Sequence, residues 1–173
     1  STRALRDVTL ANGSEYHAAA VGEVNVVAKM KEVHAVIGGE GNGGVIYPAL
    51  HYGRDALVGI ALFLTHLAKS GKRISELRAE YPPYFMSKNK ITLTPGLDID
   101  RLLNILQQRY ESVPHNTIDG LKIDFDLGWV HLRRSNTEPI IRIYSEASDL
   151  AQAEKIALNI MKEIDDIVTN TSN

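Results

Sequence analysis

Cysteine is absent from this sequence. This absence excludes a disulfide-stabilised scaffold, an iron–sulfur cluster and a zinc site built from thiolates, because each of these needs cysteine sulfur. Cysteine-free chains also suit a reducing compartment, and we therefore expect a cytoplasmic protein.

An excess of charge of either sign is also absent. The 19 basic and 21 acidic residues leave a formal net charge of −2 at pH 7. A balance this close to zero creates no overall field that would attract nucleic acid or an anionic membrane. The sequence also lacks an interleaved aromatic and basic pattern, so we expect no nucleic-acid partner and no membrane partner. Any anion site on this protein must therefore be local.

Long apolar runs are missing as well. The run ALVGIALFL, residues 56–64, is less than half of the roughly 20 residues that span a bilayer. We interpret it as part of a buried helix. The N-terminal residues are mixed and polar, unlike a signal peptide, and the first residue is Ser1 rather than methionine. We therefore expect the chain to be part of a longer protein.

Metal-ligand patterns are not visible either. The six histidines show no spacing typical of a metal site, and no nucleophilic triad of serine, histidine and carboxylate can be assembled from spacing alone. We expect neither a metal site nor a catalytic residue within this chain.

The residues that are present are enough for a core, since 44% of the 173 residues are hydrophobic. Periodicity predicts α/β structure in the first half, with helices and short strands alternating. The expected elements are helices at 1–12 and 23–33, a short buried strand at 34–38, a segment of strand character at 45–50, and a central helix at 54–72 that is packed on both sides.

A change of pattern follows the tandem prolines in AEYPPYFMSKN, residues 79–89, which we interpret as a linker because proline breaks helices and stiffens the chain. Beyond the linker, the order helix, three strands, helix predicts a two-layer α+β domain with an antiparallel sheet covered by two helices. The expected helices are 97–112 and 149–168, and the expected strands are 118–125, 129–134 and 140–147.

The first loop of interest is GGEGNGG, residues 38–44. Its glycines satisfy the dinucleotide fingerprint G-x-G-x-x-G, but that fingerprint must open a helix that holds a pyrophosphate. Here the strand-like VIYP follows instead, and Glu40 would repel a pyrophosphate. A carboxylate among glycines suits sugar hydroxyls better, because it accepts two hydrogen bonds while the glycines let the backbone approach. Composition alone equally allows a simple glycine-rich turn.

The second loop is RRSNTEP, residues 133–139. Ser135, Asn136 and Thr137 are turn-forming residues whose side chains and backbone N–H groups can converge on a phosphate. Arg133 can add a two-pronged, charge-assisted pair, and Pro139 fixes the exit into the next strand. The alternative is a polar hairpin loop with solvated arginines.

Together, and in this order, the two loops resemble the third- and fourth-domain signatures of the α-D-phosphohexomutases, the family of phosphoglucomutase, phosphomannomutase and phosphoglucosamine mutase. The fourth-domain pattern R-x-S-[GN]-T-x-P is matched by Arg133, Ser135, Asn136, Thr137 and Pro139. The third-domain pattern, GGE followed by x-[SN]-G, is matched by Gly38, Gly39, Glu40, Asn42 and Gly43. The flanking segments VGEVNV and DGLKIDFDLGWVHL are also similar to the family, so the likeness covers nearly the whole chain.

The resemblance implies a mutase that interconverts hexose 1-phosphate and hexose 6-phosphate through a hexose 1,6-bisphosphate intermediate. A phosphoserine in the first domain and a Mg²⁺ held by the second would perform the transfer. The third-domain loop would bind the sugar, and the residues implied are Gly39, Glu40, Gly41 and Asn42. The fourth-domain loop would bind the phosphate that does not react, and the residues implied are Arg133, Ser135, Asn136, Thr137 and Arg142.

The serine loop T-x-S-H-N-P and the metal loop D-x-D-x-D-R of this family are absent from the sequence. The resemblance therefore implies the C-terminal part of a mutase, with a truncated α/β third domain at 1–78, the linker at 79–89 and the fourth domain at 90–173. We expect this part to be inactive alone, and its partners to be a sugar phosphate and the missing N-terminal domains. The alternative is a stand-alone module that binds phosphosugars or anions without catalysis.

The residues of the two loops say less about which hexose phosphate is the substrate. Asn42 and Gly44 stand where many family members have serine and histidine, which removes one possible contact to the sugar or phosphate. GGEGNGGVIYP is similar to the archaeal-type branch of the family. We expect a preference for glucosamine phosphate, followed by mannose and glucose phosphates.

Overall fold

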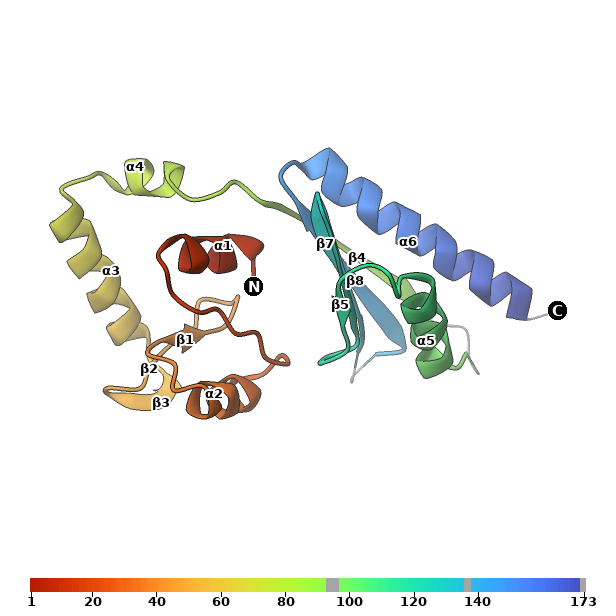
Figure 1. The fold of residues 1–173 in the computed structure, drawn as a ribbon, viewed down its shortest axis with the longest axis horizontal. Helices are drawn as coiled ribbons and strands as arrows, with labels where there is room; N and C mark the ends of the chain where they lie inside the picture. The colour runs from red at the N-terminus through yellow and green to blue at the C-terminus, as the bar shows by residue number, and fades with distance from the viewer. Residues whose placement is uncertain (93–96, 136–137, 172–173) are drawn as a thin grey trace. The chain divides into compact units, whose positions relative to one another are not determined.

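The computed structural model describes residues 1–92, 97–135 and 138–171 (Figure 1). The chain divides into two compact units, Ser1–Pro83 and Tyr84–Asn173. The tandem prolines therefore lie at the end of the first unit. Among the described residues, no helix is both long enough and apolar enough to cross a membrane.

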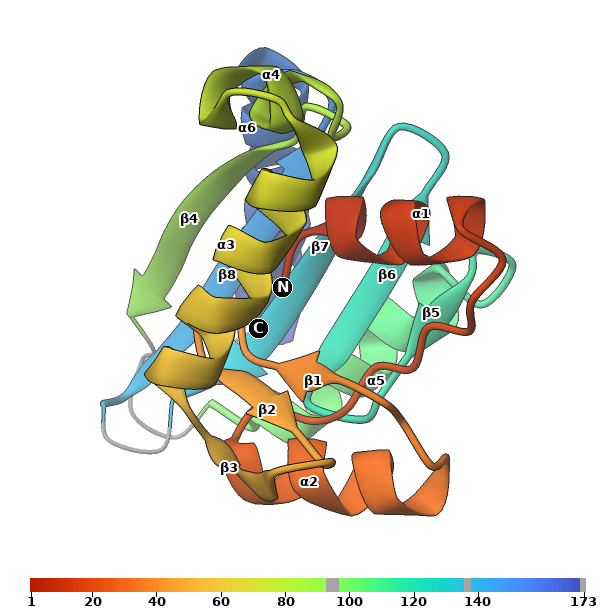
Figure 2. The same cartoon turned by 90° about the vertical axis from the view of Figure 1, so that its left-hand side faces the viewer.

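The first unit combines helices with one small antiparallel sheet of strand order β1-β2-β3. Its elements are α1 (Arg3–Ala11), α2 (Glu23–Glu32), β1 (Gly38–Gly39), β2 (Val45–Tyr47), β3 (His51–Arg54), α3 (Ala56–Ser70) and α4 (Ile74–Ala79). In Figure 2 the three strands lie beside α2, at the lower end of α3. This part of the fold confirms the predicted mixture of helices and short strands.

Local chemistry sets the limits of α3. The Asp55 side chain accepts a hydrogen bond from the backbone N–H of Val58 at 3.0 Å, which caps the first turn. Gly71 follows the last turn with a φ of +63°, a left-handed conformation that glycine adopts without strain. The helix predicted at 54–72 is therefore confirmed in its position.

The predicted burial of α3 is wrong. None of its residues is buried, and Leu57 and Ile60 are 78% and 54% exposed. Burial needs an apolar surface of matching size, and the three short strands of this unit offer little. Met30, Ile46 and Leu77 are the buried hydrophobic residues of the unit among those described.

The strand predicted at 34–38 is also largely wrong. His34 has a φ of +52°, and the backbone N–H of Ala35 donates to the Met30 carbonyl at 2.9 Å. The chain therefore leaves α2 through a left-handed turn in this segment. Val36 and Ile37 are 79% and 52% exposed, and pairing starts only at Gly38.

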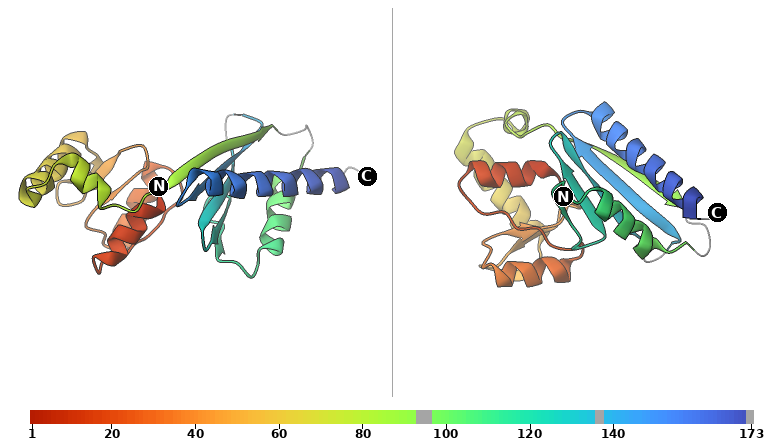
Figure 3. Two further views of the ribbon diagram at one scale, coloured as in Figure 1. Left: turned by 90° about the horizontal axis from the view of Figure 1, so that it is seen from above. Right: turned by 45° about the vertical axis from the view of Figure 1, so that its right-hand side comes forward.

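The second unit is a five-stranded antiparallel sheet of order β4-β8-β7-β6-β5. Its strands are β4 (Phe85–Thr92), β5 (His115–Asn116), β6 (Leu121–Phe125), β7 (Gly128–Arg134) and β8 (Ile140–Ala147). Helices α5 (Ile99–Arg109) and α6 (Leu150–Thr171) cover one face of the sheet, as Figures 1 and 3 show. The predicted two-layer α+β architecture is confirmed.

Alternation along the strands gives this unit its core. On β7 and β8, every second side chain points to the helices, and full burial of each is worth about 1.5–3 kcal/mol. The fully or nearly fully buried core members are Leu121, Ile123, Val130, Leu132, Ile141 and Ile143 of the sheet, with Leu102, Leu106, Ile160 and Ile164 of the helices. The opposite face of the sheet carries most of the polar and charged residues, together with the buried Trp129.

Strand β4 begins at Phe85, inside the segment that the sequence predicts as a linker. It pairs with β8 over its whole length, from Phe85 opposite Ala147 to Thr92 opposite Ile140. Its sequence, FMSKNKIT, carries lysines and an asparagine that lower its apparent strand character. Such residues are typical of an edge strand, where lysine discourages pairing with other chains.

Candidate functional site

The glycine loop forms the tight connection between β1 and β2. The backbone N–H of Glu40 donates to the Gly44 carbonyl at 3.0 Å, and the N–H of Gly43 donates back to the Glu40 carbonyl at 3.1 Å. Gly43 has a φ of +94°, and a Cβ on Gly39 would lie 2.3 Å from the Gly44 carbonyl oxygen. Asn42 accepts a hydrogen bond from the Gly44 N–H at 3.1 Å. These glycines are therefore required by the turn itself, whatever it binds.

Arg54, at the end of β3, organises the carboxylate of this loop. Its Nη1 lies 3.3 Å from Glu40 Oε2, and its Nε donates to Glu23 Oε2 at 2.8 Å. The backbone N–H of Arg54 also donates to Glu23 Oε1 at 3.1 Å. Glu40 is nearly buried, with 14% of its side chain exposed. One guanidinium therefore joins the loop to the first turn of α2.

The contacts of Arg54 affect the ionisation of Glu23. The backbone N–H and the guanidinium of Arg54 donate to Glu23 and hold the pKa of that carboxyl below its ordinary value. Arg54 and Glu23 were not predicted as site residues. The segment VGEVNV does contain Glu23, but no local pattern connects it to a residue 31 positions later.

The arginines of the second loop stand side by side. Arg133 on β7 and Arg142 on β8 are direct partners in the register. Their neighbours Leu132, Ile141 and Ile143 face the helices, so both arginines face the other side of the sheet. Arg133 Nη1 lies 3.2 Å from Asp119 Oδ2.

The loop between these strands is closed at its base. The backbone N–H of Ser135 donates to the Ile140 carbonyl at 3.0 Å, and Ser135 is only 6% exposed. Glu138 lies within the loop, and its Oε2 is 3.6 Å from Arg142 Nη2. Asn136 and Thr137, which the sequence predicts as phosphate-binding residues, lie outside the described residues.

Asp119 and Gly120, before β6, hold the same end of β7. His131 Nε2 donates to the Asp119 carbonyl at 2.5 Å. Gly120 has a φ of +78°, and a Cβ there would lie 2.2 Å from the Leu132 carbonyl oxygen. This turn therefore fits closely against the strand that carries Arg133. Asp119 was missed as a site residue because its only sequence signal is the dipeptide Asp-Gly of a turn.

His131 and Arg133 are two residues apart on β7, so their side chains lie on the same face of the sheet. Burial lowers the pKa of the His131 imidazole below its ordinary value, and the positive charges of Arg133 and Lys122 act in the same direction. The hydrogen bond to the Asp119 carbonyl opposes this shift. The neutral imidazole is therefore favoured in the folded protein.

Trp129 lies further along the same face of β7. Its Nε1 donates to Glu146 Oε1 at 2.8 Å, and both side chains are buried, at 5% and 1% exposure. The ammonium group of Lys122 lies 5.3 Å from the centre of the indole ring, within range of a cation–π contact.

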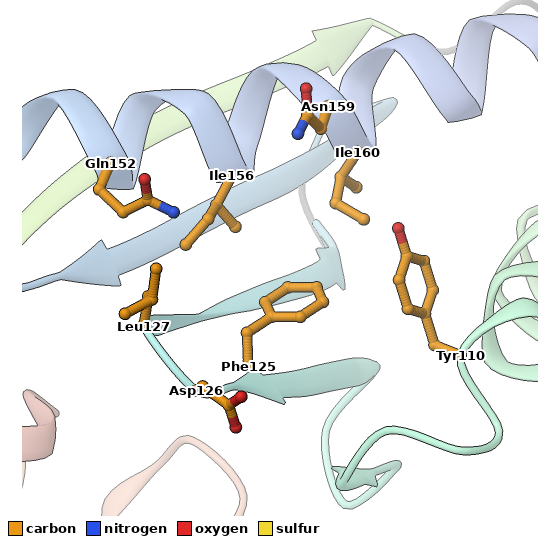
Figure 4. A pocket seen from close by; sticks show the side chains of 8 residues that line it. All are labelled: Tyr110, Phe125, Asp126, Leu127, Gln152, Ile156, Asn159 and Ile160. Atoms are coloured by element: carbon orange, nitrogen blue, oxygen red, sulfur yellow. The ribbon is translucent and has the colours of Figure 1, made fainter.

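A separate pocket of about 370 Å³ lies on the helix-covered side of the sheet, between α6 and the β6–β7 turn (Figure 4). Its lining is mostly apolar and contains none of the predicted site residues. Tyr110 is at one end, where burial and a hydrogen bond to Glu163 raise the pKa of its hydroxyl. The lining residues are Tyr110, Phe125, Asp126, Leu127, Gln152, Ile156, Asn159 and Ile160.

No group of three or more histidine, aspartate or glutamate side chains among the described residues could hold a metal ion. The residues that the structure describes therefore do not fit a Mg²⁺ site.

Comparison with protein families identifies both halves of the chain. Residues 1–84 match the model described as "Phosphoglucomutase/phosphomannomutase, alpha/beta/alpha domain III", and residues 90–163 match "Phosphoglucomutase/phosphomannomutase, C-terminal domain". The chain belongs to the phosphoglucomutase/phosphomannomutase family. The resemblance found in the two loops is thereby confirmed.

Two relatives within this family have sequences similar to this chain. The chain is 39% identical over 150 residues to a "Phosphoglucosamine/phosphogalactosamine mutase" of Sulfurisphaera tokodaii, covering 86% of this chain and 32% of the relative. It is 38% identical over 153 residues to a "Phosphoglucomutase/phosphomannomutase" of Thermococcus kodakarensis, covering 87% of this chain and 33% of the relative.

A solved structure of the family has a similar fold. A phosphoglucomutase/phosphomannomutase family protein of Burkholderia thailandensis matches with a TM-score of 0.76 and 26% identity, covering 93% of this chain and 34% of that one. The chain therefore spans about a third of the length of the relatives that it matches.

Proposed function

We propose that this chain is the substrate-recognition part of a phosphohexose mutase, an enzyme that interconverts hexose 1-phosphate and hexose 6-phosphate. In this proposal the loop at 133–139 binds the phosphate that does not react, and the loop at 38–44 binds the sugar. The observation that carries the proposal is the pairing of Arg133 with Arg142 on β7 and β8, the two strands that flank the 133–139 loop. Two guanidinium groups on one face offer paired donors to the oxygens of a phosphate.

Family membership and the names of the relatives support this reading. Phosphoryl transfer depends mainly on positioning and on stabilising charge, so binding energy from a distant phosphate can align the reacting end. We assign the phosphoserine and the Mg²⁺ to domains that precede this part in the parent protein, because their motifs are absent here. This chain alone is accordingly proposed to bind without catalysing transfer.

Glu40 is the proposed acceptor for sugar hydroxyls. Its carboxylate is held by Arg54 and remains partly exposed, so an oxygen lone pair is left for a ligand. For the substrate we propose glucosamine phosphate first, then mannose and glucose phosphates, in line with the relatives named phosphoglucosamine mutase.

The proposal is tested by an NMR titration of this chain with glucosamine 6-phosphate, mannose 6-phosphate, glucose 6-phosphate and inorganic phosphate. Arg133→Ala should weaken binding of all four by about 1.5–3 kcal/mol, because charge-assisted hydrogen bonds are lost. The matched control is Arg134→Ala, which removes the neighbouring, exposed arginine from the other face of the strand. Equal binding by the parent and Arg133→Ala would contradict the assignment of the phosphate site.

The titration also separates the roles of the two loops. Inorganic phosphate should shift resonances near residues 133–135 and 138–142 only. A sugar phosphate that is preferred should shift residues 38–44 as well. A chain that binds every anion equally, with no response at 38–44, would instead favour a stand-alone anion-binding module.

A further inference from the structure

Three cationic residues form a row across three strands of the second unit. Lys90 on β4 is the register partner of Arg142 on β8, which is the partner of Arg133 on β7. Directly opposed residues in antiparallel strands share a face, so all three side chains lie on the face opposite the helices. Ile91 and Ile141, the next pair along, belong to the helix-covered side.

A row of like charges costs stability unless anions neutralise it. Arg133 has Asp119 at 3.2 Å, and Arg142 has Glu138 at the longer distance of 3.6 Å. In residues 1–92, 97–135 and 138–171, the Lys90 ammonium group has no hydrogen bond or ion pair. Three cations against two carboxylates leave one positive charge in excess.

Arg142 gives a second, independent indication of an anion site. Its Nε is buried and has no hydrogen-bond partner within the part of the chain that the structure describes. A buried donor without an acceptor is costly, and its persistence points to an acceptor that the ligand supplies.

Two other lysines on this face, Lys88 and Lys122, already have interaction partners. Lys88, two residues before Lys90 on the same face of β4, lies 5.6 Å from the centre of the Tyr144 ring. Lys122 pairs with Asp124 at 2.6 Å. The excess positive charge therefore lies in the row of Lys90, Arg142 and Arg133, next to the 133–139 loop.

We propose that Lys90 is a third cation of the phosphate site and contacts the phosphate group of the substrate together with Arg133 and Arg142. The inference rests on the proposed function and adds to it a binding residue from a different strand. A phosphate monoester dianion carries three terminal oxygens, which suits two planar guanidinium groups and one mobile ammonium group. Lys90 is exposed at the edge of the sheet, so it can adjust to a phosphate attached at either end of a sugar.

The test compares Lys90→Met with Lys88→Met, which removes the same charge from the same strand and the same face. Affinities for inorganic phosphate and glucosamine 6-phosphate are measured by calorimetry at constant ionic strength in chloride. We expect Lys90→Met to bind both ligands about fivefold more weakly, as for an exposed charge pair. Lys88→Met should change affinity less than twofold, and Lys90→Arg should retain most of the binding.

Each outcome has a separate meaning. Equal losses in Lys90→Met and Lys88→Met would show a diffuse electrostatic effect and overturn the role of Lys90. Unchanged binding in Lys90→Met, with binding lost in Arg133→Ala, would overturn this inference and leave the proposed function standing. A parent chain that binds neither ligand would overturn both.

Discussion

Arg54 shows how a single side chain can connect a glycine-rich loop to the rest of its unit. It lies between Glu40 of the glycine loop and Glu23 of α2, with the shorter contact to Glu23. Glu23 thus competes for the guanidinium and leaves Glu40 only one contact to it. A carboxylate held in this way has a fixed direction but is not fully neutralised, which suits its proposed role as an acceptor for sugar hydroxyls.

His131 provides a prediction about pH. Its pKa is lowered on folding, so the folded protein binds fewer protons at this residue than the unfolded chain does. The stability of the second unit should therefore be fully present above the ordinary histidine pKa of about 6.5, and should fall as the pH drops below it. His131→Gln, which keeps a donor for the Asp119 carbonyl but cannot become charged, should flatten this dependence.

The measurement is urea unfolding at several pH values between 5 and 8, in which range histidine titrates. His115→Gln, on the edge strand β5, is the matched control for replacing a histidine of this unit with glutamine. A pH dependence that survives His131→Gln unchanged would show that another group is responsible.

At the scale of elements, α3 is the clearest departure from expectation. Its composition correctly predicts a helix, but composition carries no information about what lies against the helix. Apolar residues on most faces usually indicate a helix buried on both sides. Here the unit offers three short strands, and the apolar side chains of α3 are left in contact with solvent.

Polar substitution on α3 should therefore cost little in this chain. Leu57→Gln should change the free energy of unfolding by less than about 0.5 kcal/mol, because a largely exposed side chain loses no packing. Ile46→Ala, at a fully buried position of β2, should cost about 2–5 kcal/mol. Chemical denaturation of both variants measures the contrast, and a cost above 2 kcal/mol for Leu57→Gln would mean that the helix is covered.

The strands of the second unit differ in how clearly the sequence predicts them. IIRIYSEA alternates apolar and polar residues because one face packs on α6, and this period makes β8 easy to predict. FMSKNKIT packs less apolar surface, since β4 is an edge strand, and it was assigned to a linker. The pairing of Lys90 with Arg142 depends on that strand and could not be predicted without it.

At the scale of the whole molecule, the sequence predicts local chemistry better than distant contacts. The loops at 38–44 and 133–139 were selected from their residues alone, and their binding roles stay predictions. The contacts of Arg54 with Glu23 and of Arg133 with Asp119 were not predicted, because each depends on how an element packs on another: α2 beside β3, and the turn before β6 beside β7. The predicted burial of α3 in the first unit was wrong because burial depends on the area of the neighbouring elements, which the sequence of the helix does not show.

The two units should differ in stability. The second has a continuous core between its sheet and two helices, whereas the first buries few hydrophobic side chains. Calorimetry of the whole chain should therefore show two transitions, with the second unit unfolding at the higher temperature. A chain of residues 84–173 should reproduce the upper transition by itself. One transition in the whole chain, absent from the shorter chain, would show that the units fold only together.

Trp129 makes the second unit optically distinct. It is the single tryptophan of the sequence, and its buried indole donates a hydrogen bond to Glu146. Selective excitation of tryptophan therefore reports on the second unit, and emission should move to longer wavelength when the indole meets water. Because Trp129 and Arg133 share one face of one strand, we expect the same emission to respond to ligand binding at the proposed phosphate site in real time, without any attached dye.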